Sequence, residues 1–326
     1  MLKVDKTWVL NQTNVRKKEI VIVSHVAAFY ENTAQTPLQI VEDPIFIERG
    51  VKVYIKRDDL IHPNISGNKW RKLKYNLLEA ERTGSQKLLT FGGAFSNHIA
   101  AVAAAGQALN FETIGIIRGE ELTPDSNTTL QFAKTVGMQL IFVSRTDYRN
   151  KEELENRHGK GAFIIPEGGS NALAIEGVKE VMQEIAAQLP QEIDYVCTAL
   201  GTGGTAAGIT SVFDGRVVVF PSLKIKNEEA EQMILQLTNV CKGTLDIKTD
   251  YHFGGYGKSN ERLLEFIKNF EQINLIPLEQ VYTGKMMFGI YDLLLKGYFK
   301  KGDVVVVIHT GGLQGRNSFL DEIKRK

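Results

Sequence analysis

The sequence predicts an α/β protein built on parallel sheets, and three observations carry that prediction. Apolar runs rich in Val, Ile and Phe alternate almost without a break with helical patterns, the order typical of parallel strands joined by helices. The 326 residues allow roughly two domains. Five Gly-Gly pairs occur, and four of them follow an apolar run within a few residues, as expected where strands end at a ligand crevice.

Eight strands are expected, each a short run of apolar and β-branched residues. They cover residues 51–55, 87–91, 113–117, 139–143, 162–165, 195–199, 216–220 and 303–308. A further strand, the first in the chain, is expected within residues 20–29. That segment follows three basic residues and faintly resembles a signal peptide, but His25 interrupts it and no small-residue cleavage site follows.

Eight helices are expected between these strands. They cover residues 68–82, 97–109, 125–136, 171–188, 204–212, 226–240, 260–269 and 285–298. Thr123 and Pro124 are a typical start signal for the third helix, and Gly84 and Gly137 are typical stops. The acidic runs at 152–155 and 228–231 are expected on solvated helix faces.

Composition restricts the kind of partner. Lys and Arg number 39 and Asp and Glu 38, so the net charge of +1 gives no field that favours nucleic acid or an anionic membrane. No stretch approaches 18 apolar residues. Cys197 and Cys241 form no CxxC motif, and the histidines include no pair at helical ligand spacing. We therefore expect a cytoplasmic protein that binds a small molecule, with no metal, nucleic-acid or membrane partner.

The strongest candidate for a phosphate-binding loop directly follows the expected strand 195–199 and opens a helix. It consists of Gly201, Thr202, Gly203, Gly204 and Thr205. Glycine at such a position lets backbone amides approach an anion. With Ala206 the loop also satisfies a loose dinucleotide pattern, so an NAD-binding oxidoreductase is an alternative, although the strand 216–220 is not followed by the acidic residue that would bind a ribose.

A second glycine pair, Gly168-Gly169, precedes Ser170. The segment lacks one residue of a hydrolase nucleophile elbow, because Ala172 stands where glycine is needed. Ser170 is therefore expected to act as a helix cap beside a glycine turn.

Lys69 follows a glycine turn at the start of the expected helix 68–82. The helix N-terminus and the neighbours Arg71, Lys72 and Lys74 disfavour a protonated amine, and a neutral amine can bond to an aldehyde. Four basic residues at a helix start are more often solvated surface, and this window alone favours that second interpretation.

Several stretches together resemble the tryptophan-synthase-β-like enzymes that use pyridoxal phosphate, and most closely the family of D-cysteine desulfhydrases and 1-aminocyclopropane-1-carboxylate deaminases. In the family's order they are Lys56-Arg57-Asp58-Asp59-Leu60, Gly67-Asn68-Lys69, Gly92-Gly93-Ala94-Phe95-Ser96-Asn97-His98, Pro166-Glu167-Gly168-Gly169-Ser170-Asn171, the glycine-threonine loop, Tyr282-Thr283-Gly284-Lys285 and His309-Thr310-Gly311-Gly312. The resemblance implies fold type II of the pyridoxal-phosphate enzymes, with a larger cofactor domain (1–71 and 166–326), a smaller mobile domain (72–165) and a homodimer.

The resemblance also implies roles for the matching residues. Lys69 would hold the cofactor covalently and then move the α-proton of a small amino-acid substrate. Ser96 and the amides of its loop would hold the substrate carboxylate, Asn97 the phenolic oxygen of the cofactor, and residues 201–205 its phosphate. Tyr256 and Tyr282 would line the pocket, the alternative for each being core packing with a satisfied hydroxyl.

Two positions separate the activities within the resemblance. Ring-opening deaminases carry Glu after the pocket tyrosine and Leu before the last Gly-Gly, whereas this chain has Thr283 and Thr310. A neutral Thr310 near the pyridine nitrogen would give a milder electron sink, suited to loss of a good β-leaving group. D-cysteine β-elimination to pyruvate, ammonia and sulfide is therefore expected. Ring opening of 1-aminocyclopropane-1-carboxylate is the alternative, and an NAD-binding oxidoreductase or a non-catalytic ligand-binding protein is more remote.

Overall fold

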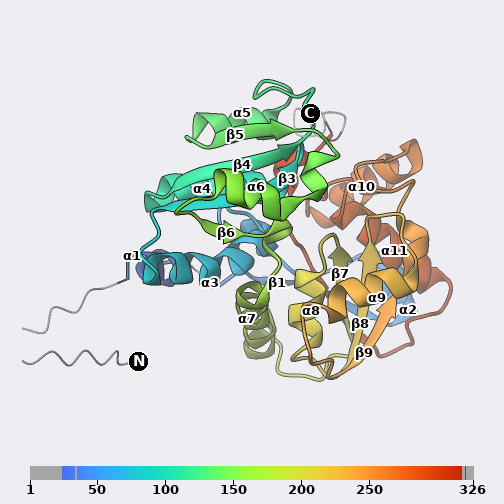
Figure 1. Cartoon of the computed structure of the whole chain (residues 1–326). Helices are drawn as coiled ribbons and strands as arrows, with labels where there is room; N and C mark the ends of the chain where they lie inside the picture. The colour runs from blue at the N-terminus through green and yellow to red at the C-terminus, as the bar shows by residue number, and fades with distance from the viewer. Residues whose placement is uncertain (1–23, 34, 318–319, 321–326) are drawn as a thin grey trace, which may run out of the picture.

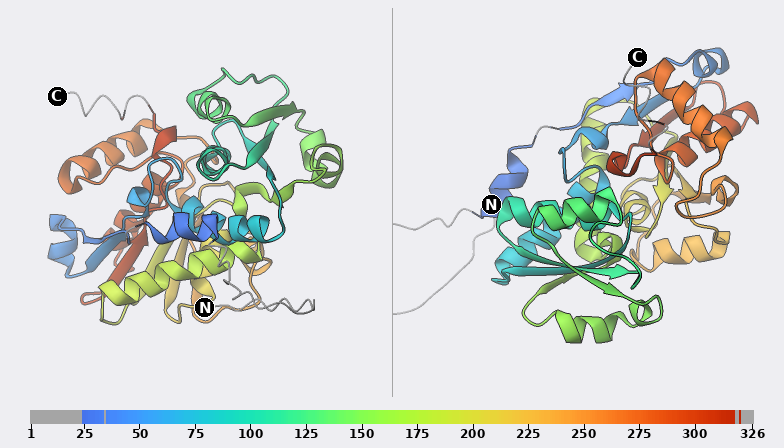
Figure 2. Two further views of the ribbon diagram at one scale, coloured as in Figure 1. Left: turned by 90° about the vertical axis from the view of Figure 1, so that its left-hand side faces the viewer. Right: turned by 90° about the horizontal axis from the view of Figure 1, so that it is seen from above.

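The computed structural model describes residues 24–33, 35–317 and 320 (Figure 1). The strands of this part form two separate sheets, one of six strands and one of four. Figure 2 shows the two sheets, each with its own helices, as two lobes. The expected α/β class with parallel sheets is confirmed.

The larger sheet has the order β1-β2-β10-β7-β8-β9. Its strands are β1 (Leu38–Ile40), β2 (Lys52–Lys56), β7 (Tyr195–Leu200), β8 (Arg216–Pro221), β9 (Thr244–Ile247) and β10 (Val304–Ile308). Every neighbouring pair is parallel except β1 with β2. A parallel sheet of this kind has helices on both faces, so its central strands read as unbroken apolar runs.

Strand β10 shows how the larger sheet divides its core. All five of its residues are buried. Val305 and Val307 point into one core and Val306 and Ile308 into the other, because successive side chains of a strand face opposite ways. The first core is covered by α2 (Pro44–Arg49), α10 (Glu261–Asn274) and α11 (Thr283–Leu295), and the second by α7 (Ala172–Gln188), α8 (Gly204–Thr210) and α9 (Asn227–Leu235).

The smaller sheet is parallel throughout, with the order β5-β4-β3-β6. Its strands are β3 (Lys87–Gly93), β4 (Glu112–Arg118), β5 (Gln139–Val143) and β6 (Phe163–Ile165), and its helices include α4 (Asn97–Leu109), α5 (Thr128–Thr135) and α6 (Lys151–His158). Ile117 of β4 packs toward α4 and α5, and Ile114 and Ile116 pack toward α6 on the other face. Each sheet therefore has cores of its own.

Helix α3 (Asn68–Arg82) connects the two lobes. Its Trp70, Leu73 and Leu77 lie in the core of the smaller lobe, while its other face packs against α7. At the crossing, a Cβ on Gly177 would stand 1.9 Å from the carbonyl oxygen of Arg71, so only glycine permits the close approach. The domain boundary expected between residues 71 and 72 falls within this helix, whose first turn carries Lys69.

The strand expected within residues 20–29 is wrong over its described part. Residues 20–23 lie outside the described residues, and His25–Glu31 form helix α1. Ser24 caps this helix through its hydroxyl, which accepts a hydrogen bond from the N–H of Ala27, and the carboxylate of Glu81 accepts from the N–H groups of His25 and Val26. Three satisfied N–H donors in the first turn favour a helix over an apolar strand.

The other expected elements are present, with shifted ends. The spans of α3, α4 and β5 agree with expectation, whereas the helix expected over 226–240 ends at Leu235 and the one expected over 260–269 continues to Asn274. The unexpected β1, α2 and β9 are short, and α6 contains the acidic run at 152–155. Short 3-10 helices occur at Asp58–Leu60, Asp147–Arg149, Glu167–Gly169, Thr249–Tyr251 and Leu313–Gly315. Within the described residues, no helix is both long enough and apolar enough to cross a membrane.

Candidate active site

A cavity of about 300 Å³ lies where the carboxyl ends of strands from both sheets meet. Its walls come from the ends of β3, β4 and β7 and from the segments after β6, β8 and β10. The expected site residues that line it are Lys69, Ser96, Asn97, Gly201, Thr202, Gly203, Thr205, Tyr256, Tyr282 and Thr310. Gly204, the remaining one, begins α8 directly behind Gly203. The structure thus gathers the expected set into one site.

Lys69 enters the cavity from the first turn of α3. Its Nζ donates a hydrogen bond to the neutral Oδ1 of Asn68, over 3.0 Å. The Nδ2 of Asn68 donates to the Oγ1 of Thr205, over 2.8 Å. Burial lowers the pKa of Lys69 to about 8, because the charged form of the amine loses solvation. Asn68 therefore joins the lysine to the glycine loop.

The charges of Arg71 and Lys74 do not cause this lowered pKa, contrary to the expectation from sequence. Arg71 is buried and pairs with Asp58 and Glu184 at 2.6 and 2.8 Å. Lys74 pairs with a carboxylate of α7 at 2.6 Å. Their charges are therefore compensated, and desolvation of the amine is the cause. The alternative of a solvated basic surface is wrong for Arg71 and Lys72, both of which are buried.

The loop 201–205 forms a cradle that depends on glycine. Gly203 has a φ of 86°, in the left-handed region that glycine adopts without strain. A Cβ on Gly203 would stand 2.9 Å from the carbonyl oxygen of Met233, and one on Gly204 would stand 2.6 Å from the Oγ of Ser170. Larger residues at these two positions would clash with their packed neighbours, so glycine lets the loop pack closely while Gly201, Thr202 and Gly203 line the cavity.

Lys72 lies beside the cradle and is only 2% exposed. Its Nζ donates to the Oγ of Ser170, over 3.0 Å, and to the carbonyl oxygen of Gly168, over 3.2 Å. Both acceptors are neutral. Burial, followed by the positive charge of Lys69, holds the pKa of Lys72 well below its usual range. An anion bound in the cradle would relieve both effects, since it would supply the countercharge that Lys72 lacks.

Ser170 does not have the role expected from sequence. Asn171, with extended backbone, caps α7 by accepting the N–H of Ala174 over 2.9 Å. The Oγ of Ser170 lies instead 2.6 Å from the Oγ1 of Thr202 and accepts from Lys72. Ser170 therefore links the buried lysine to the glycine loop.

Ser96 and Asn97 lie at the start of α4, facing the glycine loop across the cavity. The Oγ of Ser96 caps the helix by accepting the N–H of Ile99 over 3.3 Å. The Oδ1 of Asn97 accepts from Gln314 over 2.8 Å. No hydrogen bond joins the Nδ2 of Asn97 to another described residue, so this donor is available to a ligand oxygen.

Tyr256 and Tyr282 form the wall opposite the smaller sheet. Their rings meet edge to face at 6.1 Å, and Tyr256 is 39% exposed. Core packing is therefore wrong for Tyr256, and Tyr282 also lines the cavity. The buried Lys285 donates to the carbonyl oxygens of His252 and Gly255, over 2.8 Å each, and so fixes the loop that carries Tyr256.

Thr283 and Thr310 differ in where they point. Thr310 lines the cavity. Thr283 is fully buried, and its Oγ1 donates to the carboxylate of Glu279 over 3.0 Å. That carboxylate also accepts the backbone N–H groups of Tyr282 and Thr283. Of the two positions that the sequence singled out, only Thr310 can contact a ligand directly; Thr283 anchors the turn that carries Tyr282.

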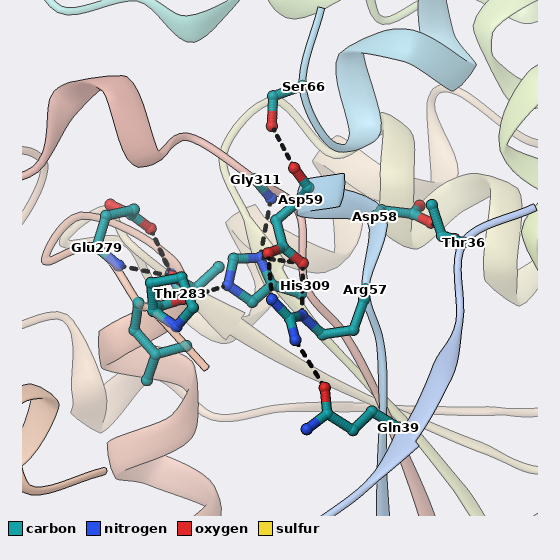
Figure 3. A network of polar contacts seen from close by, with 12 residues as sticks. Thr36, Gln39, Arg57, Asp58, Asp59, Ser66, Glu279, Thr283, His309 and Gly311 are labelled. Carbon is teal, nitrogen blue, oxygen red and sulfur yellow. Dashed lines mark hydrogen bonds and ion pairs between the residues drawn. The ribbon is translucent and has the colours of Figure 1, made fainter. Parts of the chain in front are cut away.

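A polar network includes His309 and Gly311, the two chain neighbours of Thr310 (Figure 3). The Nε2 of His309 lies 2.7 Å from the carbonyl oxygen of Pro277, and its Nδ1 accepts the N–H of Gly311 over 3.2 Å. Asp59 lies 3.6 Å from the same ring and binds Arg57 through both carboxylate oxygens. The motif Lys56-Arg57-Asp58-Asp59-Leu60 therefore supports the site from outside the cavity.

Several lining residues were not assigned a role from sequence. They are Asn68, Lys72, His98, Arg118, Glu167, Gly168, Ala199, Leu223 and Met233. The position of Arg118 and Glu167 just after strands was a usable signal, because the carboxyl ends of parallel strands share one edge. The burial of Lys72 could not be predicted from local sequence, because it depends on packing against α7 and the loop 168–170.

The residues present fit pyridoxal 5'-phosphate. Lys72 and the glycine cradle offer a buried cation and open backbone to a phosphate. Lys69 offers an amine of lowered pKa to an aldehyde, and Asn97 offers its Nδ2 to a phenolic oxygen. These residues cover the phosphate, the aldehyde and the phenolic oxygen of the cofactor.

The fold and the site together define the class: the chain belongs to the pyridoxal-phosphate-dependent enzyme family, whose family model matches residues 31–311. It is 30% identical over 306 residues to the bifunctional D-cysteine desulfhydrase/1-aminocyclopropane-1-carboxylate deaminase, mitochondrial, of Arabidopsis thaliana, which covers 85% of this chain and 76% of that protein. It is 29% identical over 289 residues to a D-cysteine desulfhydrase of Klebsiella pneumoniae, covering 81% and 87%.

A solved structure described as an ACC deaminase homologue matches with a TM-score of 0.75 and 28% identity, covering 92% of this chain and 98% of that chain. The expected fold type II and the expected cofactor, pyridoxal phosphate, are confirmed by the family. The NAD-binding alternative is thereby displaced.

Proposed function

We propose that this enzyme catalyses β-elimination from D-cysteine or a closely related small amino acid. With water, D-cysteine would give pyruvate, ammonia and hydrogen sulfide. One observation carries the proposal: the amine of Lys69, with a pKa lowered to about 8, lies between the glycine cradle and the Ser96 loop. Relatives named D-cysteine desulfhydrase support the choice of substrate.

Each residue has a defined task in this proposal. The bound cofactor would supply a conjugated electron sink that spreads the negative charge of the α-carbon. Lys69 moves the α-proton through Nζ, since an amine with a pKa near neutrality can both accept and return it. The hydroxyl of Ser96 and the amides of its loop hold the carboxylate and fix the α-carbon opposite that amine. Residues 201–205 and Lys72 hold the phosphate.

The lowered pKa of Lys69 predicts how the rate of cofactor attachment depends on pH. Only the neutral amine attacks an aldehyde, so the rate in protein stripped of cofactor should rise with pH up to about 8 and then level off. A lysine of ordinary pKa, about 10.4, would keep gaining rate beyond pH 9. Stopped-flow absorbance between pH 6 and 10 measures the profile, and a continued rise above pH 9 would contradict the lowered pKa.

The direct test is an assay of purified protein reconstituted with pyridoxal phosphate. We expect sulfide and pyruvate in equal amounts from D-cysteine, and little 2-oxobutanoate from 1-aminocyclopropane-1-carboxylate. The second reaction is retained as a candidate because the Arabidopsis relative is named for both. A cofactor-loaded enzyme that opens the ring and leaves D-cysteine unchanged would reverse the order of the two candidates.

Thr310→Leu tests the residue proposed to favour elimination. The change removes the hydroxyl proposed to face the ring nitrogen of the cofactor, and we expect D-cysteine turnover to fall about tenfold. Thr135→Leu, on the exposed side of α5, is the control and should change nothing. Undiminished D-cysteine turnover in Thr310→Leu would remove Thr310 from the mechanism.

The proposal includes the organisation implied by the resemblance: a smaller domain of residues 72–165 that closes over the substrate, a homodimer and a cytoplasmic location. Closure would exclude water while charge develops at the α-carbon. The separate cores of the two sheets support an independent motion. Small-angle scattering with and without a substrate analogue measures closure, and light scattering measures the oligomeric state.

A further inference from the structure

The charges that line the cavity are unbalanced. Lys69, Lys72 and Arg118 are the cations among the lining residues, and Glu167 is the one carboxylate. Glu167 is already paired, because Lys151 binds it at 2.8 Å. His98 does not add a charge: burial, followed by the charges of Lys69 and Lys72, holds its pKa well below the usual range. The site is thus built to receive more than one anionic group.

Two of the three cations have a task in the proposed function and Arg118 has none. Lys69 holds the cofactor, and Lys72 faces its phosphate. Arg118 is the last residue of β4 and is exposed at the edge of the cavity. Its guanidinium stands 5.6 Å from the centre of the Tyr148 ring. It makes no hydrogen bond or ion pair within the described part of the chain.

Arg118 lies near the part of the cavity that is proposed to hold the substrate. Its Nη2 lies 3.5 Å from the place that a Cβ on Gly93 would occupy, beside the loop proposed to hold the substrate carboxylate. Tyr256 lines the same cavity, and the charge of Arg118 is among the smaller effects that lower the pKa of this tyrosine, which burial raises. Arg118 therefore shares the cavity with the carboxylate loop and the tyrosine pair.

We propose that the preferred substrate is a small amino acid whose side chain carries a second anionic group, and that Arg118 recognises this group. The inference rests on the proposed function and names its substrate class more narrowly. A guanidinium offers a planar pair of donors that matches a carboxylate or a phosphate. Arg118 lines the cavity, and its guanidinium lies over the ring of Tyr148. The α-carboxylate is held by the Ser96 loop, which leaves Arg118 for the side chain.

The test uses two compounds that differ by one charge and hardly in shape, S-carboxymethyl-D-cysteine and S-carbamoylmethyl-D-cysteine. The first would react with water to pyruvate, ammonia and mercaptoacetate, the second to the corresponding amide. On the cofactor-loaded wild type we expect kcat/KM about tenfold higher for the charged compound. Arg118→Gln should bring the two values within about twofold, chiefly by raising KM for the charged one, and should leave the neutral one unchanged.

Arg145→Gln is the matched control, because Arg145 follows the neighbouring strand β5 and pairs with Glu121 outside the cavity. It should keep the full preference. Equal kcat/KM for both compounds in the wild type would overturn the proposal. So would an equal loss for both in Arg118→Gln, since Arg118 would then serve the α-carboxylate that they share.

A binding measurement separates this proposal from the proposed reaction. D-aspartate and D-asparagine are a second matched pair, and neither has a β-leaving group. Calorimetry on the cofactor-loaded enzyme should give about tenfold tighter binding of D-aspartate, lost in Arg118→Gln. If no compound yields pyruvate while this preference persists, the proposed β-elimination is wrong and the recognition of an anionic side chain by Arg118 is supported. If pyruvate forms from D-cysteine and neither pair shows a charge preference, the proposed role of Arg118 is wrong and the β-elimination is supported.

Discussion

Replacing Lys69 with Ala is expected to lower D-cysteine turnover by about 10³-fold or more and to abolish the visible absorption of the attached cofactor. Both losses have one cause, because the Nζ of Lys69 is proposed to hold the cofactor and to move the α-proton. The measurement is an absorption spectrum of each reconstituted protein followed by a pyruvate assay.

Lys74→Ala is the control for that experiment. Lys74 lies on the same helix but pairs with Glu180 of α7 at 2.6 Å, outside the lining of the cavity. Its loss should leave the spectrum and the turnover within about twofold of wild type. A Lys69→Ala protein that keeps the visible band would overturn the assignment of the lysine, whatever its activity.

Replacing Lys72 with Met is expected to change cofactor affinity and stability in opposite directions. The buried ammonium is proposed to face the phosphate, so its removal should weaken pyridoxal phosphate binding about 100-fold. Without the cofactor the same ammonium has only neutral partners among the described residues. Removing it should therefore stabilise the cofactor-free protein by about 1–3 kcal/mol.

The sign of the pH dependence follows from the lowered pKa of Lys72. The unfolded chain binds a proton at this lysine up to about pH 10, and the folded chain releases it at lower pH, so the stability of cofactor-free wild type rises with pH in between. The Lys72→Met protein has no amine at this position and lacks this pH dependence. The amount by which its free energy of unfolding exceeds that of wild type should therefore be largest at the acidic end of this pH range and shrink toward pH 10. Denaturant unfolding at several pH values measures it, and a constant difference would contradict the buried, unpaired lysine.

Much of the fold could be predicted because strands and helices alternate so regularly. The glycine loop was predicted for a related reason, since its position after β7 and its composition are both local features. Thr283 shows the limit. Its sequence position marks it as a pocket residue, but Thr283 is fully buried and its hydroxyl donates to the carboxylate of Glu279, which precedes it in the chain. The residue type alone does not tell whether such a hydroxyl faces a ligand or a buried carboxylate.

Lys72 shows the same limit for the site. Four basic residues at a helix start look like solvated surface, and the burial of Lys72 depends on Gly168 and Ser170, almost a hundred positions later. The first helix was missed for a comparable reason, because Glu81 supplies its N-terminal acceptor from the far end of α3. The burial of Lys72 and the helix α1 both depend on a partner from another element.

The assembly of the cavity from the ends of two sheets with separate cores has an evolutionary consequence. The glycine loop and Thr310 come from the larger sheet, whereas Ser96 and Arg118 come from the smaller one. Exchanges at Ser96 or Arg118 on the smaller lobe would therefore change substrate recognition while the loop proposed to hold the cofactor phosphate, on the larger lobe, stays the same. Neither set of buried strands would need to change, so new specificities could arise at small cost to foldability.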